Sequence, residues 1–494
     1  MKRARIAVAV GATGIAAVLG ISLLTPSGGA TPALPSLVSD NPVNYTPIIR
    51  GNECLDDQVA DATCRRVRDI TRIGDTVWAG GVIDRVTDQA TGQTSTFGNA
   101  ISFNAKTGAV RSDFRPTFTD SAGGLPGGQV QAVERSTFGT AVWFGGEFKQ
   151  VNGVAAKGLV RWDLATNKQF TQFNPRIGSD NKTAKVYDVK YFCGHLWVAG
   201  DFTQVGGVNR TALVSLDPTT GAVTNEVNLG ISGTSSSTAG PTRVTKIAPS
   251  PNCKRAVIIG NFRSVVGHER YQVAVLNVDP ASGRASLAPW YSPFHLRASQ
   301  LGVGANPCGE SLPVYVRDVD WAPDGTWWAL ATTGGNRPYP TLCDSVSRWT
   351  NDDSTDARPV WINYSGGDTF LSVRVTGQHV YVGGHFRELD HAVYRFGKKV
   401  NYVGHVHYGL GVLNATFSSG MSVSGWNDGA TTGRGAGWAA MLPNPGPAGT
   451  ASGLWVGGDA NTIKGETGKR IALLPLFCRQ LGAAAAGFPA PSAR

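Results

Sequence analysis

Three aspartates fall at equivalent points of a repeated pattern, and they are the strongest candidates for chemistry in this sequence. Asp69, Asp188 and Asp318 each lie in a short apolar segment that we expect to form a strand. If these strands line one axis, their carboxylates could bind a cation or a polar ligand, or hydrolyse a glycosidic bond if two of them lie roughly 5–10 Å apart. The competing interpretation is an ion-pair network between neighbouring strands, because interior charges are normally paired.

Further polar residues share these axial segments, so we predict one ligand-binding set. The set comprises Asp69, Asp188, Asp318, Arg68, Arg317, Lys246 and Tyr187. His405 and His407 would place two imidazoles on one strand face as half of a metal site, but surface histidines in an extended loop explain the pattern as well. No nucleophile elbow, phosphate-binding loop or dinucleotide motif has the right context, so we assign no catalytic residue, no metal and no cofactor.

The elements that must position these residues come from one recurring phrase, an apolar run that ends in glycine, often with phenylalanine two positions later. Its aligned glycines are Gly81, Gly146, Gly200, Gly260, Gly384 and Gly458. The spacing is about 60 residues, except for one gap of 124 that predicts a degenerate seventh copy around Trp327 to Ala331. A short apolar strand precedes each phrase, and two further strands with a glycine-rich turn follow it.

Four strands in each of seven copies predict an all-β fold, a seven-bladed β-propeller of four-stranded antiparallel blades over residues 66–476. The N-terminal segment 31–65 would supply the closing strand, with Val43 to Ile49 pairing beside residues 471–474, since a ring needs its last edge covered. We expect the Ala/Pro-rich tail 477–494 to be disordered. The alternative is two smaller β domains divided near residues 300–312, although the period continues on both sides.

The repeat resembles the delta-60 repeat of bacterial secreted and cell-surface β-propellers. The resemblance rests on Gly-Gly-Glu-Phe-Lys-Gln-Val-Asn-Gly at 145–153, Gly-Asp-Phe-Thr-Gln-Val-Gly-Gly at 200–207, Leu-Val-Arg-Trp-Asp at 159–163 and Phe-Asn-Pro at 173–175. It covers most of residues 66–476, and the fifth copy departs most because it lacks the Gly-x-Phe element. It implies a propeller and an exported location, and it carries over no functional residue.

The N-terminus has the features of an export signal. Basic residues at positions 2, 3 and 5 precede an apolar run over residues 6–24, and small residues follow up to Ala30. We expect residues 1–30 to be a cleaved signal peptide, which makes the protein secreted. The alternative is a retained anchor formed by residues 6–24, which would hold the protein on the outer face of the membrane.

Seven cysteines suit an exported chain. We predict the disulfides Cys54–Cys64, Cys193–Cys253 and Cys308–Cys343. The second of these would join equivalent turns of adjacent copies. Cys478 is left over, and the alternative pairs it with Cys54 or Cys64.

Because the repeated positions all have structural explanations, we expect a secreted or cell-surface binding or scaffold protein without enzymatic activity. Its ligand would be an extracellular glycan, a wall polymer or a protein. The alternatives are a propeller hydrolase or lyase acting on carbohydrate through the axial carboxylates, and an adhesion protein without a small-ligand site. The net charge of +10 is scattered, so we expect no nucleic-acid partner. We expect a monomer that meets the membrane only through an uncleaved N-terminal segment.

Overall fold

The computed structural model describes residues 32–51, 64–120, 128–137, 139–178, 184–235, 240–295, 308, 315–335, 341–401, 404–416, 420–423, 425–426, 437–446 and 451–476. Within these ranges the chain is all-β, built from many small antiparallel sheets, with the short 3-10 helix η1 (Pro293–His295). Over the same ranges, no helix has the length and apolar character needed to cross a membrane. The predicted signal segment 1–30 and tail 477–494 lie outside the described residues.

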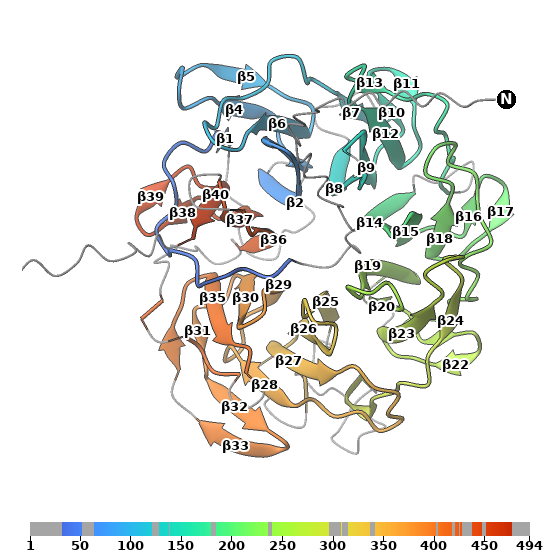
Figure 1. The fold of residues 1–494 in the computed structure, drawn as a ribbon, viewed down its shortest axis with the longest axis vertical. Helices are drawn as coiled ribbons and strands as arrows, with labels where there is room; N and C mark the ends of the chain where they lie inside the picture. The colour runs from blue at the N-terminus through green and yellow to red at the C-terminus, as the bar shows by residue number, and fades with distance from the viewer. Residues whose placement is uncertain are drawn as a thin grey trace, which may run out of the picture.

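Seven of the described sheets are arranged around the centre of the molecule, and each of these contributes one inner strand (Figure 1). The inner strands are β2 (Arg66–Ile73), β8 (Gln129–Arg135), β14 (Lys185–Phe192), β19 (Arg243–Pro249), β25 (Tyr315–Trp321), β29 (Phe370–Val375) and β36 (Trp438–Asn444). Each inner strand contacts the next one along the chain, and β36 contacts β2. The inner strands therefore close a ring.

The recurring glycine phrase forms the second strand of each of these seven sheets. These second strands are β3 (Thr76–Val82), β9 (Ala141–Glu147), β15 (His195–Asp201), β20 (Arg255–Asn261), β26 (Trp327–Thr333), β30 (His379–Gly384) and β37 (Gly453–Gly458). The degenerate phrase around Trp327 thus occupies the second position of its sheet, as β26.

Third strands follow on the outer side of the second strands. They are β6 (Ala100–Asn104), β12 (Leu159–Asp163), β18 (Leu213–Leu216), β23 (Val273–Val278), β27 (Ser345–Thr350), β35 (Leu410–Asn414) and β40 (Ile471–Pro475). A fourth strand is present as β13 (Lys168–Gln169), β24 (Ala285–Leu287) and β28 (Trp361–Tyr364). At the same position beyond β6, β18 and β35, the pairing is reduced to single bridges at Val110, Val223 and Ser422.

The recurring glycine is required by the close approach of the inner strand. A Cβ atom at Gly81 would lie 2.0 Å from the carbonyl oxygen of Arg66, and one at Gly146 would lie 2.0 Å from that of Gln129. Both distances are far below van der Waals contact, so any larger residue would push the two strands apart. The repetition of glycine in the sequence therefore reflects backbone packing rather than chemistry.

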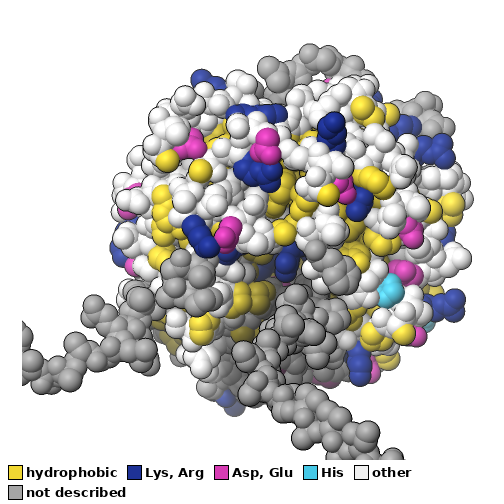
Figure 2. Space-filling view, turned by 45° about the horizontal axis from the view of Figure 1, so that its top comes forward, with side chains coloured by type: hydrophobic (Ala, Val, Ile, Leu, Met, Phe, Trp, Pro, Cys, Tyr) yellow, Lys and Arg dark blue, Asp and Glu magenta, His cyan; other side chains and the backbone are white. Residues whose placement is uncertain are grey.

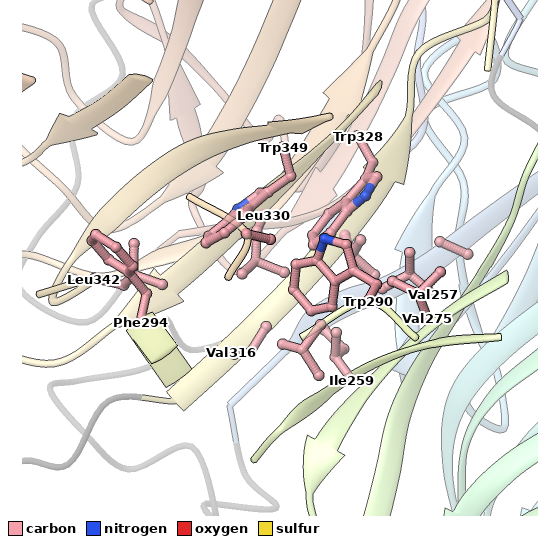
Figure 3. Packing of buried hydrophobic residues seen from close by; sticks show 14 of the residues in the cluster. Val257, Ile259, Val275, Trp290, Phe294, Val316, Trp328, Leu330, Leu342 and Trp349 are labelled. Carbon is pink, nitrogen blue, oxygen red and sulfur yellow. The ribbon is translucent and has the colours of Figure 1, made fainter. Parts of the chain in front are cut away.

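The core lies between neighbouring sheets, where large aromatic side chains fill the space. Between the sheets of β19 and β25, the indole rings of Trp328 and Trp349 stack with centroids 5.6 Å apart, and Trp290 meets Trp328 edge-on at 5.3 Å (Figure 3). All three indoles are buried. Packing of this kind between flat sheet faces holds the sheets side by side around the ring.

The N-terminal segment covers the last sheet, although not with all of the predicted residues. The backbone N–H groups of Ser39 and Val43 donate to the carbonyl oxygens of Pro475 (2.7 Å) and Leu473 (3.0 Å) of β40. Ile48 and Ile49 instead form β1 (Ile48–Arg50), which pairs with β4 (Arg85–Thr87) beside the first sheet. The prediction was wrong for these two residues because Ile49 is buried in the core of the first sheet, opposite Val86.

Two of the three predicted disulfides are confirmed. Cys193 and Cys253, with Cα atoms 6.5 Å apart, join the turn between β14 and β15 to the turn between β19 and β20. Cys308 and Cys343 have Cα atoms 5.5 Å apart. Cys64 is also disulfide-bonded. Cys54 and Cys478 lie outside the described residues, so the choice between them as partner of Cys64 stays a prediction.

Candidate functional site

Every inner strand carries a β-bulge near its start, and the predicted site residues fall on two positions at this bulge. The pairing with the second strand shifts between Val67 and Asp69 in β2, and at the matching place in the other inner strands. Arg68, Tyr187 and Arg317 are the extra residues of their bulges, whereas Asp69, Asp188, Lys246 and Asp318 are the residues that follow. A bulge re-aims the side chains around it, which separates the two groups.

The three aspartates have one shared structural role. The second carboxylate oxygens of Asp69, Asp188 and Asp318 accept the backbone N–H groups of Val133 (2.8 Å), Ile247 (2.8 Å) and Val373 (3.0 Å). Each of these N–H groups belongs to the inner strand of the following sheet. The carboxylates therefore link β2 to β8, β14 to β19 and β25 to β29 by charge-assisted hydrogen bonds.

Two of these carboxylates also have a cationic partner. The Nζ of Lys190 lies 3.3 Å from Asp188 and 3.7 Å from Glu134, and a guanidinium nitrogen of Arg374 lies 2.8 Å from Asp318. Burial would lower the pKa of Lys190, but Asp188 and Glu134 raise it above its ordinary value. These contacts include ion pairs between neighbouring strands, as the alternative interpretation predicted. They also include groups that a partner of opposite charge does not fully neutralise.

Glu134 is one such group. Burial raises the pKa of its carboxyl to about 7, the ammonium of Lys190 opposes this shift, and the charge of Asp69 adds to it. Its side chain is 18% exposed. Glu134 is therefore an acid that can carry or release a proton near neutral pH, on the wall of an accessible space.

That space is a cavity of about 450 Å³ between the inner strands. Its charged lining residues are Asp69, Arg72, Glu134, Arg135, Lys190, Lys246, Asp318, Asp320 and Arg374. A cavity of this volume is within the usual range for a small-molecule site. The ammonium of Lys246 has no hydrogen bond or ion pair with any described residue, so it can donate to a ligand.

The structure thus brings only part of the predicted ligand-binding set to the cavity. Asp69, Lys246 and Asp318 line the cavity, whereas Asp188 is fully buried behind Lys190 and does not. The prediction missed Glu134, Lys190, Asp320 and Arg374. Each of these lies two residues after the position of the bulge aspartate in its own strand, and the two-residue period of a strand could have revealed them.

Arg68, Tyr187 and Arg317 do not line this cavity. Burial and the neighbouring charge of Arg66 lower the pKa of Arg68 to about 9. The guanidinium of Arg243 lies over the ring of Tyr187, 5.6 Å from its centroid. These residues form a separate layer closer to the starts of the inner strands.

The histidines of the sixth copy do not form a metal site among the residues described. The Nδ1 of His405 lies 2.9 Å from the buried carboxylate of Asp390, and burial lowers the pKa of His407 to about 4. The described part of the chain holds no group of three His, Cys, Asp or Glu side chains arranged for a metal ion.

A ring of radial antiparallel sheets with a polar cavity among its inner strands defines this protein as a β-propeller. No protein-family model matches the sequence, and no curated protein matches it. The solved structures similar to it include hydrazine synthase of Kuenenia stuttgartiensis, with 11% sequence identity, a TM-score of 0.40, and coverage of 85% of this chain and 99% of that chain. The β-propeller domain of Cps50 (Swd1) of Myceliophteria thermophila is similar with 11% identity, a TM-score of 0.39, and coverage of 87% and 98%.

Proposed function

We propose that this chain is an exported seven-bladed β-propeller of the delta-60-repeat type, and that it acts as a binding protein through its central cavity. The ring from β2 to β36, with residues 38–43 beside β40, supports seven blades and an N-terminal closure. The Cys193–Cys253 and Cys308–Cys343 disulfides support an oxidising, extracellular location. The predicted signal segment 1–30 is consistent with that location.

The cavity and its available polar groups are the observation that carries this proposal. Backbone N–H groups hold the carboxylates of Asp69 and Asp318 in place, and Arg374 also pairs with Asp318, so both carboxylates are pre-organised acceptors. Lys246 adds an available donor, and Glu134 can act as donor or acceptor according to its protonation. Fixed donors and acceptors around a small cavity suit a ligand rich in hydroxyl groups, because binding then costs little reorganisation.

We assign the ligand to extracellular carbohydrate, as the end of a glycan or of a wall polymer. Charges of both signs are interspersed over the face of the molecule shown in Figure 2, which favours a ligand recognised locally rather than an extended polyanion. A sugar end of one or two rings fits a cavity of about 450 Å³.

A glycan-array screen tests this proposal, followed by calorimetry on any glycan that binds. The protein used starts at Thr31, because every described strand lies from Ile48 onward. We expect Lys246→Met to weaken binding at least about tenfold, since it removes a charged hydrogen bond. Lys254→Met, at an exposed position outside the cavity, is the matched control and should bind normally. Equal binding by both variants, or an array without any bound glycan, would contradict the proposal.

The enzymatic alternative rests on Glu134. Its carboxyl, with a pKa of about 7, lines the same cavity as the carboxyl of Asp69, and glycoside hydrolysis uses two carboxyl groups of this kind. If the protein cleaves a glycan that it binds, new reducing ends should accumulate, and Glu134→Gln should abolish their formation while binding persists. Binding without cleavage would leave the non-enzymatic function in place.

A further inference from the structure

The sixth blade departs from the repeat at its outer hairpin. In four other blades this hairpin closes with a two-residue turn, at Asn152-Gly153, Gly206-Gly207, Val266-Gly267 and Lys464-Gly465. In the sixth blade the matching strands are β31 (Glu388–Leu389) and β34 (His405–Val406), which pair in the same way. The residues between them form an additional hairpin, so the chain carries an insertion where the repeat needs only a turn.

This additional hairpin projects from the rim of the molecule. It consists of β32 (Ala392–Arg395) and β33 (Lys398–Asn401), and β32 pairs with β28 of the preceding sheet. That sheet therefore has six strands, with β33 at its outer edge. Figure 1 shows both strands at the periphery, far from the central axis. An insertion at this place contributes nothing to the central cavity.

The tip of the hairpin is Phe396-Gly397, and it carries an aromatic side chain in an unfavourable conformation. Phe396 has a φ of +46° and Gly397 a φ of +77°, as in the tight two-residue turns that prefer Asn-Gly. A bulky residue rarely adopts a positive φ. Phe396 is nevertheless 58% exposed, and the guanidinium of Arg395 lies over its ring, 5.3 Å from the centroid.

Basic residues flank this aromatic tip. Arg395 precedes Phe396, and the exposed Lys398 and Lys399 follow Gly397. The sequence from His391 to Asn427 contains no Asp or Glu. Val400, next to the two lysines, is 52% exposed. The hairpin therefore combines an exposed aromatic group with three cations and lacks acidic residues of its own.

We propose that the β32–β33 hairpin docks on a membrane surface rich in anionic phospholipid, with Phe396 entering the interface. Aromatic side chains partition to the headgroup boundary, and each nearby Lys or Arg adds attraction to anionic lipid. The edge strand β33 does not favour the addition of a partner strand, because two lysines on an edge oppose strand pairing. The hairpin thus gives the propeller a membrane contact that is independent of its N-terminal segment.

Sedimentation with lipid vesicles tests this proposal on the protein that starts at Thr31. We expect binding to vesicles of equal parts phosphatidylglycerol and phosphatidylcholine at low salt, weaker binding at 0.5 M salt, and little binding to phosphatidylcholine alone. Phe396→Asn should reduce partitioning about tenfold, although asparagine suits the turn and should preserve or raise the melting temperature. The double variant Lys398→Gln with Lys399→Gln should lower partitioning at least tenfold, because each lysine contributes roughly fivefold.

Val266→Asn is the matched control for the aromatic tip. Val266 is 52% exposed, has a φ of +51° and lies in the two-residue turn that closes the β21–β22 hairpin of the fourth blade, so its replacement should leave vesicle binding unchanged. The proposal is wrong if the protein ignores anionic vesicles at low salt, or if Phe396→Asn binds like the unmodified chain. If a soluble polyanion displaces the unmodified chain and the Phe396→Asn variant from the vesicles to the same extent, that result would instead identify an acidic polymer as the partner.

Discussion

Glu134 is a cavity residue whose ionisation is shifted by its burial. Its carboxyl is largely shielded from water and is close to the charge of Asp69, so its neutral form is favoured up to about pH 7. In the unfolded chain the same carboxyl ionises near its ordinary value of about 4.5. Between these two values the folded state holds a proton that the unfolded state has released.

Folding stability should therefore fall as the pH rises from 4.5 to 7, and Glu134→Gln should remove this contribution. Gln cannot ionise, so we expect the variant to match the unmodified protein near pH 4.5 and to exceed its free energy of unfolding by about 3 kcal/mol at pH 8. Denaturant titrations across this pH range measure the difference. Glu269→Gln, at an exposed position, should leave the pH dependence as it is. A Glu134→Gln variant with the unmodified pH profile would rule out the assigned pKa.

Of the residues that line the cavity, the sequence predicted those whose residue type recurs at one position of the repeat. It missed those at a position where the residue type varies. Asp69 and Asp318 stood out because they share a position in the repeat, and both line the cavity. Glu134 and Lys190 lie at a second repeat position occupied by different residue types in each copy, so no alignment of copies marks them. Asp188 shares the position of Asp69, but it is fully buried next to Lys190 and does not reach the cavity. Its burial depends on side-chain packing, which the repeat pattern does not show.

The strands themselves were largely predictable because each follows a local apolar run closed by a turn. Glycine spacing placed the second strands, and even the divergent segment around Trp327 forms β26. The β32–β33 hairpin was not anticipated, because an insertion has no counterpart in the other copies. The position of β1 was also missed, since pairing with β4 rather than β40 depends on the burial of Ile49.

The Cys193–Cys253 disulfide connects two adjacent sheets at their turns, and its removal should weaken this connection. The bond closes a loop of 60 residues, for which the chain-entropy model gives ~4 kcal/mol. We expect Cys193→Ser with Cys253→Ser to lower the free energy of unfolding by up to that amount, measured in denaturant. Reduction of the unmodified protein should produce at least as large a loss. If the double variant is as stable as the oxidised protein, the disulfide does not stabilise the ring.

At the scale of the whole molecule, the N-terminal segment joins the two ends of the chain. Val38 is fully buried against the last sheet, its N–H donates to the hydroxyl of Tyr381, and its carbonyl accepts the indole N–H of Trp426. With the backbone bonds of Ser39 and Val43 to β40, this segment covers an edge that would otherwise face water.

Deletion of residues 32–43 should therefore lower the free energy of unfolding by about 4 kcal/mol, from the loss of buried apolar area and of several hydrogen bonds. Thermal unfolding followed by circular dichroism measures the change as a reduced melting temperature. Deletion of residues 479–494, which leaves Cys478 in place, is the control and should have little effect. An unchanged melting temperature after the first deletion would mean that the ring closes without the N-terminal segment.

The links made by Asp69, Asp188 and Asp318 also limit how the number of sheets in such a ring can change. Each link joins one sheet to the next and skips the junction that follows, so six of the sheets form three linked pairs and the sheet of β36 takes part in none of these links. Removal of any one of these six sheets would leave either a carboxylate without its amide or an amide without its carboxylate, whereas removal of the sheet of β36 would break none of these bonds. Removal or duplication of a linked pair leaves every such bond intact. For the six linked sheets, the modular unit for engineering is therefore a pair of sheets, and the sheet of β36 is a unit by itself.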